Sequence, residues 1–261
     1  MQLSTIEVPT TAVPANLRSV TGFCSQQHPE SCDATWQVRG FVFEAANVLY
    51  DDTAWRRWLY RLLTGMGLHT QYAGLFRLWD DEYLCPVRRG ERGFDDAFRM
   101  FLRAVGLSNA QIQEVEASAC PRLASFEASV RPLPGVLPTL ERLCSSGGQL
   151  AVLSDCIQTG DDLAARLASM GLGRSIQHCR SSIDLHATKP SPTCYTSILD
   201  DMALAPQEVA FVGYRRAELS GAAASGLHTV AFNWDADAQA DVYLQHFEGL
   251  IERFEKHRCA A

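Results

Sequence analysis

The second half of the chain alternates short apolar segments with amphipathic ones, and this pattern restricts the possible folds more than any other feature. Apolar segments at residues 149–155, 176–182, 208–214 and 228–234 predict buried strands, and the stretches between them have helical spacing. An earlier apolar segment, residues 38–43, predicts one more strand of the same kind. Strands that alternate with helices form a parallel sheet with helices on both faces. We therefore expect an α/β fold with a Rossmann-like parallel sheet.

A long stretch between the first two predicted strands is helical throughout. Phe94, Phe98, Phe101 and Leu102 recur at helical spacing, and Ser108 is a suitable N-cap for the helix that follows. Residues 1–36 are rich in Thr, Ser, Pro, Gln and Cys and lack periodicity, which predicts an irregular N-terminal extension. The expected domains are this extension, an α/β core at 37–54 and 131–261, and a small all-helical domain at 55–130 inserted after the first strand.

Composition argues against several classes of partner. The formal net charge is −7, so the chain has no electrostatic reason to bind nucleic acid or an anionic membrane. No apolar run reaches the roughly 18 to 20 residues of a membrane helix, and the first residues show no signal-peptide pattern. The nine cysteines form no C-x-x-C pair, so we expect reduced thiols and a cytoplasmic location. The sequence leaves the oligomeric state open.

The carboxyl ends of the predicted strands carry the candidate site, because ligands bind at this edge of open parallel sheets. The residues at these positions are 44–47, 154–155 and 213–216. Lys189 is a further candidate, because it is one of only two lysines in a chain that otherwise uses arginine.

Four blocks of sequence add to this pattern: FEAANVLYDD at residues 43–52, LAVLSD at 150–155, TKPSPTCY at 188–195 and FVGYRRAELSGAAASGL at 211–227. In order and spacing they resemble the motifs of the haloacid dehalogenase superfamily, in members with a helical cap after the first strand. The resemblance covers about residues 38–235. It implies an α/β hydrolase core and a substrate-covering cap, although a fold alone does not establish an activity.

The resemblance assigns roles to several positions, and the motifs are degenerate at most of them. Glu44 stands where the family has its nucleophilic Asp, Ala46 where it has the acid/base Asp, and Asn47 where it has a Gly. Tyr214 replaces an Asp that binds metal, and a second acid falls on Glu218.

Two matches are retained in the second and third blocks. Ser154 matches the Ser or Thr that holds a phosphoryl oxygen, and Lys189 matches the family lysine; Asp155 replaces the usual Asn. We therefore treat Glu44, Ser154 and Lys189 as the candidate catalytic residues.

These replacements are expected to slow the phosphoryl transfer that the family resemblance implies. The extra methylene of Glu44 moves its oxygens by about 1.5 Å, and a misplacement of about 1 Å can cost on the order of 10²-fold in rate. Ala46 supplies no proton, which typically costs about 10² to 10⁴-fold. A Tyr phenol is a poor substitute for an acidic Mg²⁺ ligand at neutral pH. We expect an impaired or inactive enzyme.

We hypothesise that Glu44 and Lys189 form an ion pair in the former metal site. Arg215 or Arg216 would then add positive charge, which favours a small anion of the phosphate type near Ser154 and the helix N-terminus after it. Asn47 and Asp155 are further ligand-binding candidates. Glu44 equally fits a solvated acid without a role, and the two arginines equally fit ordinary surface residues.

Three functions remain open. The first is an impaired family member that binds a small anion or a protein partner, without a cofactor. The second is an active phosphomonoesterase that uses Glu44, with Glu44 and Glu218 or Asp155 as ligands of Mg²⁺. The third is a metal-free hydrolase of the dehalogenase type. A rise in thermal stability on adding metal would favour the second.

Overall fold

The computed structural model describes residues 37–252. The predicted N-terminal extension, residues 1–36, lies outside the described residues. Within them, none of the helices is both long and apolar enough to span a membrane.

Six parallel strands form one sheet in the order β3-β2-β1-β4-β5-β6. The strands are β1 Gly40–Phe43, β2 Gln149–Ser154, β3 His178–Ser181, β4 Val209–Gly213, β5 His228–Phe232 and β6 Val242–Leu244. The first strand is central, because it pairs with both β2 and β4. The predicted α/β fold and its parallel sheet are therefore confirmed. The sequence did not predict β6, whose three residues are too few to show a pattern.

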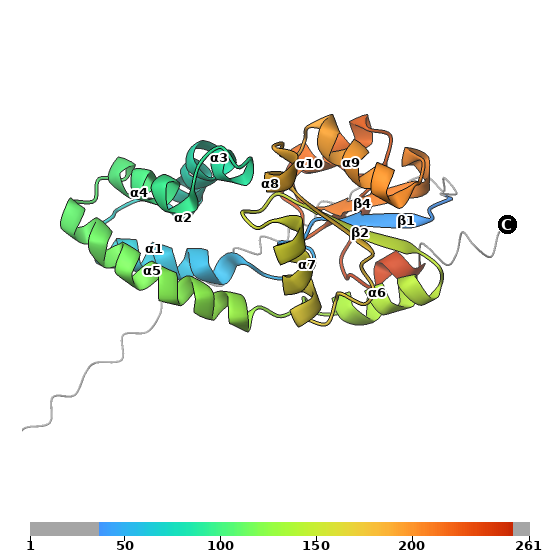
Figure 1. Ribbon diagram of the computed structural model, residues 1–261, viewed down its shortest axis with the longest axis horizontal. Helices are drawn as coiled ribbons and strands as arrows, with labels where there is room; N and C mark the ends of the chain where they lie inside the picture. The colour runs from blue at the N-terminus through green and yellow to red at the C-terminus, as the bar shows by residue number, and fades with distance from the viewer. Residues whose placement is uncertain (1–36, 253–261) are drawn as a thin grey trace, which may run out of the picture. The chain divides into compact units, whose positions relative to one another are not determined.

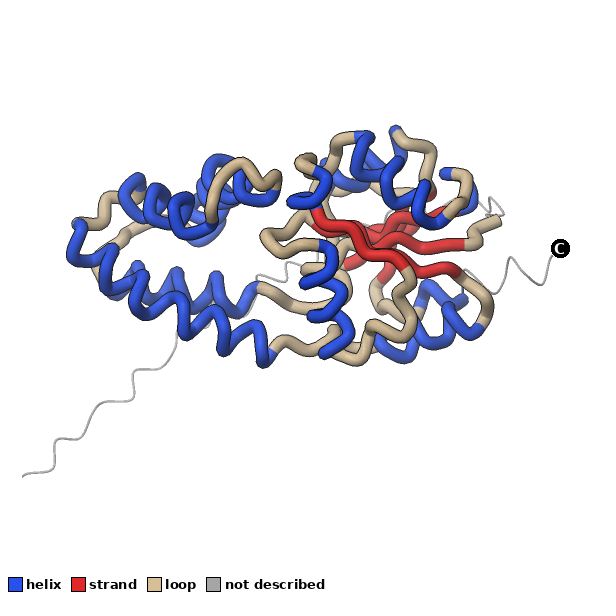
Figure 2. Tube along the Cα trace, viewed as in Figure 1, coloured by secondary structure: helices blue, strands red, loops and turns tan. Residues whose placement is uncertain are grey.

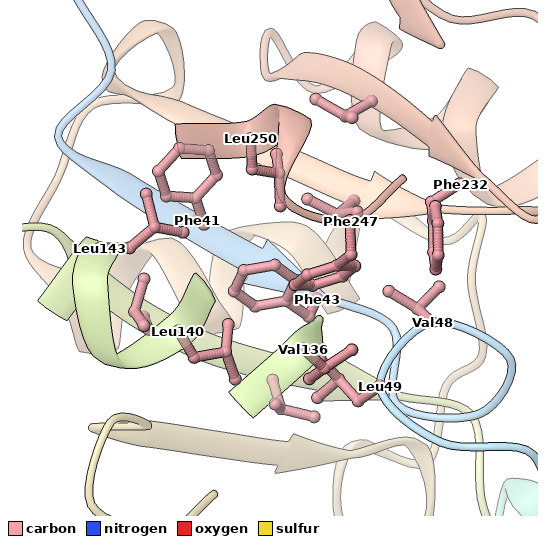
Figure 3. Packing of buried hydrophobic residues seen from close by; sticks show 14 of the residues in the cluster. Phe41, Phe43, Val48, Leu49, Val136, Leu140, Leu143, Phe232, Phe247 and Leu250 are labelled. Atoms are coloured by element: carbon pink, nitrogen blue, oxygen red, sulfur yellow. The ribbon is translucent and has the colours of Figure 1, made fainter. Parts of the chain in front are cut away.

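Helices cover both faces of this sheet, as Figures 1 and 2 show. Successive residues of a strand point to opposite faces. Phe41 and Phe43 pack with α6 (Val136–Ser145) and α7 (Gly160–Ser169) on one face, together with the segment that contains Phe247 (Figure 3).

On the opposite face of the sheet, Val42 packs in a second cluster with α9 (Pro192–Met202) and α10 (Arg216–Ala224). Two short helices complete this part of the chain, α8 (Ser182–Leu185) and the 3₁₀ turn η3 (Pro206–Glu208). Strands that are buried on both faces explain why their sequences are nearly continuous apolar runs.

The chain between β1 and β2 is helical, and we call residues 53–129 the helical insert. Its elements are α1 Thr53–Gly65, α2 Tyr72–Leu78, the π-helix η2 Trp79–Leu84, α3 Cys85–Arg88, α4 Phe94–Ala104 and α5 Asn109–Ser129. The insert has its own core, which includes the fully buried Leu59, Leu63 and Phe101. Ser108 caps α5 through a capping box with Gln111, as predicted. That the insert acts as a cap over a substrate stays a prediction.

One hydrogen bond joins the insert to the residues after β3. His186, at the end of α8, donates from Nδ1 to the carbonyl oxygen of Arg89, 3.0 Å away. Because that oxygen can only accept, the bond requires the proton on Nδ1. The end of α3 is therefore attached to α8.

Candidate functional site

The carboxyl ends of three adjacent strands bring the candidate residues together. Phe43 pairs with Val152 on one side and with Val212 on the other, so the residues that follow β1, β2 and β4 meet at one edge. Glu44 follows β1 directly, and Ser154 ends β2. The predicted convergence of Glu44, Ser154 and Lys189 is present in the structure, and their catalytic roles stay predictions.

Both carboxylate oxygens of Glu44 are occupied. Oε1 accepts hydrogen bonds from the Ser154 hydroxyl and, at 2.8 Å, from the backbone N–H of Ala45. Oε2 lies 2.8 Å from Nζ of Lys189. Burial alone would raise the pKa of Glu44, but the charge of Lys189 and these hydrogen bonds hold it below its usual value. Glu44 is therefore a buried carboxylate that stays ionised.

Lys189 is the cation at the centre of this network. Its Nζ lies 2.8 Å from Glu44, 3.1 Å from Oδ1 of Asp155 and 3.2 Å from the carbonyl oxygen of Leu153. Burial would lower the pKa of Lys189, but the charges of Asp155 and Glu44 raise it above its usual value. The hypothesised Glu44–Lys189 ion pair is present, and Asp155 is a third member.

Glu218 does not join this ion pair. Its Oε1 accepts the backbone N–H of Tyr214 at 2.9 Å and of Arg215 at 2.8 Å, where α10 begins. Burial and the charge of Glu44 raise the pKa of Glu218 to about 7. Tyr214 is half-buried, and its removal from water raises its pKa to about 12. The carboxylate of Glu218 therefore fixes the turn that carries Arg215.

Two predicted ligand-binding residues lie outside the pocket described below. Asn47 has a φ of 61°, in the left-handed region that Asn tolerates better than most residues, and its carbonyl oxygen accepts from Asn233. This conformation accounts for Asn where the family pattern has Gly. Arg216 is exposed and lies 3.7 Å from Asp237. The structure brings Arg215 to the pocket and leaves Arg216 at the surface.

The helix N-terminus expected to attract an anion is occupied by protein groups. The backbone N–H of Gly160, the first residue of α7, donates to Asp184 at 2.6 Å. The Thr159 side chain caps the same helix by accepting from the N–H of Asp162.

The acidic residues at the strand ends are the candidates here for ligands of Mg²⁺, which prefers six oxygens in octahedral geometry. Glu44 and Asp155 face the ammonium of Lys189, Glu218 accepts backbone N–H groups, and Tyr214 replaces a carboxylate. Within residues 37–252, no group of three or more His, Cys, Asp or Glu side chains is placed to hold a metal ion. This donor set does not fit Mg²⁺.

A cavity of about 160 Å³ opens beside Glu44, between the strand ends and the helical insert. Its strand-end wall includes Glu44, Ala46, Ser154, Asp155 and Arg215. Its other wall is largely aromatic and aliphatic, with Trp55, Trp79, Leu84, Phe94, Leu123 and Phe126. A concave, mostly apolar site with a few convergent polar groups is the usual form of a small-molecule site.

Three more arginines line this cavity, and sequence analysis did not select them. Arg56 forms two 2.8 Å hydrogen bonds to Asp80, and Arg88 lies 3.7 Å from the same carboxylate. Arg166, on α7, stacks over the ring of Tyr50 with 4.9 Å between guanidinium carbon and ring centroid. These residues are far apart in the sequence and follow no motif, so only the folded chain reveals them as neighbours.

The α/β fold and the carboxylate-bearing edge define a hydrolase-like protein, and comparison with known proteins gives the family. Residues 37–226 match the family model described as haloacid dehalogenase-like hydrolase. This match covers most of the chain, so the chain belongs to the haloacid dehalogenase-like hydrolase family, as the motifs implied.

Two curated relatives carry the name of a dehalogenase. (S)-2-haloacid dehalogenase 4A of Burkholderia cepacia is 36% identical over 114 residues, which cover 43% of this chain and 48% of the relative. (S)-2-haloacid dehalogenase 1 of Pseudomonas sp. (strain CBS-3) is 30% identical over 100 residues, 38% of this chain and 43% of the relative. The matched segments span about half the length of these curated relatives.

Solved structures share the fold over more of the chain. The crystal structure of a dehalogenase has a TM-score of 0.62 and 25% identity, and the match covers 82% of this chain and 96% of that one. L-2-haloacid dehalogenase from Xanthobacter autotrophicus has a TM-score of 0.61 at 18% identity, with 82% and 97% covered, and it shows the fold alone.

Proposed function

We propose that this chain binds a small organic anion in the cavity beside Glu44 and that hydrolysis at Glu44 is impaired. The occupied carboxylate of Glu44 carries the proposal. A carboxylate that accepts three hydrogen bonds and keeps a lowered pKa is a weak nucleophile, because its lone pairs are already engaged. Ala46 adds no proton donor beside it.

Arg215 is the residue that we assign to the anion. Its guanidinium stacks on the ring of Tyr214 at 5.1 Å, and among residues 37–252 no carboxylate lies within ion-pair distance of it. An arginine held in place and free of a partner can form two parallel hydrogen bonds to a carboxylate or a phosphate. Ser154 is less suited, since its hydroxyl hydrogen is directed to Glu44.

The proposal includes the absence of a cofactor, because Glu44 and Asp155 are paired with Lys189 rather than arranged for Mg²⁺. It also keeps two further proposals: a cytoplasmic location, on the cysteine pattern, and the absence of a nucleic-acid partner, on the net charge of −7.

A second candidate is hydrolysis of the dehalogenase type, which the names of the curated relatives favour. Glu44 would attack the halogen-bearing carbon of a 2-haloacid, so that a C–O ester bond forms and halide leaves. Water would then cleave this ester, giving the 2-hydroxyacid, a proton and the free carboxylate. This route requires no metal ion.

One experiment separates these functions. Purified wild-type protein is assayed for halide release from (S)-2-chloropropionate, and for phosphate release from a phosphomonoester panel with Mg²⁺. Glu44→Ala, Glu44→Asp and the triple variant Glu44→Asp/Ala46→Asp/Tyr214→Asp are run beside it. We expect the triple variant to exceed the wild type by at least about 10²-fold on a phosphomonoester, the factor expected for restored positioning and acid–base help.

The contrary results are specific. Wild-type halide release that disappears in Glu44→Ala would replace the proposed function by the dehalogenase candidate. Wild-type phosphate release that needs Mg²⁺ and Glu44 would overturn both and establish a phosphomonoesterase.

A further inference from the structure

Three buried side-chain N–H donors, on residues that line the cavity, have no hydrogen-bond acceptor among the described residues. They are Nε1 of Trp55, Nε of Arg88 and Nε of Arg166. They come from three helices, α1, α3 and α7. Within residues 37–252 only one other buried side-chain atom, Oγ1 of Thr139, shares this condition. Native structures pair most buried polar groups, so three such donors in residues lining one cavity indicate a place for an acceptor from outside the chain.

The aromatic wall indicates what kind of molecule carries that acceptor. Trp55 and Phe94 pack at 6.4 Å between ring centroids, and Trp79 meets Phe94 edge-on at 5.8 Å. All three line the cavity. Inorganic phosphate would gain nothing from these surfaces, whereas the body of an aromatic ligand would bury apolar area against them.

The charges around the cavity leave room for an anion. Glu44 and Asp155 share the single positive charge of Lys189, Arg57 lies 3.2 Å from Asp51, and Arg56 pairs with the Asp80 carboxylate. Among the arginines that line the cavity, Arg166 lies 3.7 Å from Glu127, and Arg88 reaches only the already occupied Asp80, at 3.7 Å. Arg215 has no carboxylate within ion-pair distance among residues 37–252, so it is the cation available to an anion. Asp52 also lines the cavity, and burial raises its pKa, which makes its charged form less favourable than that of an exposed Asp.

We propose that the ligand is an aromatic carboxylate that carries an oxygen acceptor on its ring. Its carboxylate binds Arg215, its ring packs on Trp55 and Phe94, and its ring oxygen accepts from Nε1 of Trp55 and from Nε of Arg88 or Arg166. This inference rests on the proposed function, because it specifies the chemical class of the anion bound beside Glu44.

The test is calorimetric titration of the full-length protein with four probes: acetate, phenylacetate, 4-hydroxyphenylacetate and inorganic phosphate. We expect phenylacetate to bind at least about tenfold more tightly than acetate, because its ring buries apolar area. We expect 4-hydroxyphenylacetate to bind more tightly than phenylacetate by about another tenfold, because its phenol oxygen pairs with buried donors.

Variants assign this affinity to named groups. Arg215→Gln should weaken all three carboxylates by at least about tenfold. Trp55→Phe keeps an aromatic ring but removes one N–H, so it should lower only the advantage of 4-hydroxyphenylacetate over phenylacetate. Arg216→Gln is the matched control, since it removes the same charge one residue away, outside the cavity. A thermal melt of each variant confirms that it is folded.

The outcomes distinguish the two proposals. If acetate and phosphate bind as tightly as the aromatic acids, the aromatic ligand is wrong and anion binding stands. If none of the four probes binds the folded wild-type protein, both proposals fall. Equal weakening by Arg215→Gln and Arg216→Gln would also overturn the inference, because it would show a general effect of charge.

Discussion

The polar groups around the cavity differ in whether they have hydrogen-bond partners within the chain. At the strand ends, Glu44, Ser154, Lys189 and Glu218 are buried and every one has partners within hydrogen-bonding distance. Elsewhere around the cavity, Trp55, Arg88 and Arg166 keep buried N–H groups without an acceptor among the described residues. These four strand-end groups are satisfied as folded, whereas the three N–H donors gain hydrogen bonds only from a ligand.

This difference separates groups that hold the fold from groups available for binding. A buried network with all partners present is costly to break, because removal of one member leaves another charge without compensation. A buried donor without an acceptor lowers stability while it stays empty, so its removal should do the reverse. Substitutions on the two walls should therefore change stability with opposite signs.

Lys189→Met should have the largest effect. It leaves Glu44 and Asp155 buried without their cation, and we expect it to lower the free energy of unfolding by about 3 to 5 kcal/mol. Urea unfolding monitored by circular dichroism measures this loss. The double variant Lys189→Met/Glu44→Gln should recover part of it, and a double variant as unstable as Lys189→Met would show that Glu44 is not the group left uncompensated.

Titration of Glu218 should have the next largest effect. Its pKa is raised from 4.5 to about 7 in the folded protein, so the folded state binds more protons than the unfolded state between these values. Stability should therefore fall as pH rises through this window, by on the order of 1 to 3 kcal/mol. Unfolding free energies of wild type and Glu218→Gln across pH 4.5 to 7.5 provide the comparison. A profile that Glu218→Gln leaves unchanged would assign the titration elsewhere.

Arg88→Met should act in the opposite direction to Lys189→Met. It replaces a buried guanidinium that lacks an acceptor at Nε by an apolar chain, so we expect the unliganded protein to become more stable by about 1 kcal/mol. Chemical denaturation without ligand measures the change. A loss of 2 kcal/mol or more would mean that the 3.7 Å contact with Asp80 is structural, and would remove Arg88 from the binding wall.

Arg216→Gln should have the smallest effect, within about 0.5 kcal/mol, because its contact with Asp237 is long and exposed. The same denaturation experiment checks it. A larger change would indicate that this arginine contributes to the strand-end wall after all.

Strands β1, β2 and β4 could be predicted because burial on both faces makes them nearly continuous apolar runs. Phe41 to Phe43 and residues 209–213 are of this kind. β6 was missed because three residues between irregular segments have no measurable period. The π-helix at Trp79–Leu84 also has no signature in the sequence, since it differs from an α-helix only in its hydrogen bonding.

The strand-end wall could be predicted for a related reason. Glu44 follows β1, Ser154 ends β2 and Arg215 lies two residues after β4, and the ends of parallel strands converge wherever the sheet forms. The ligand-facing wall could not, because Trp55, Arg88 and Arg166 belong to helices whose packing alone decides what they face. Trp55 packs in the core of the helical insert and also lines the cavity, and nothing in its sequence position distinguishes the second role from the first.

The hydrogen bond between His186 and Arg89 determines more than the docking of α8. Arg88 ends a helix of only four residues, which is too short to keep its own orientation in water. The position of the Arg88 guanidinium therefore depends on the groups that hold the ends of this helix. One of them is the imidazole of His186, which is 97 residues from Arg89 in the sequence. The tautomer of His186 therefore affects the position of the Arg88 guanidinium through the backbone of Arg89.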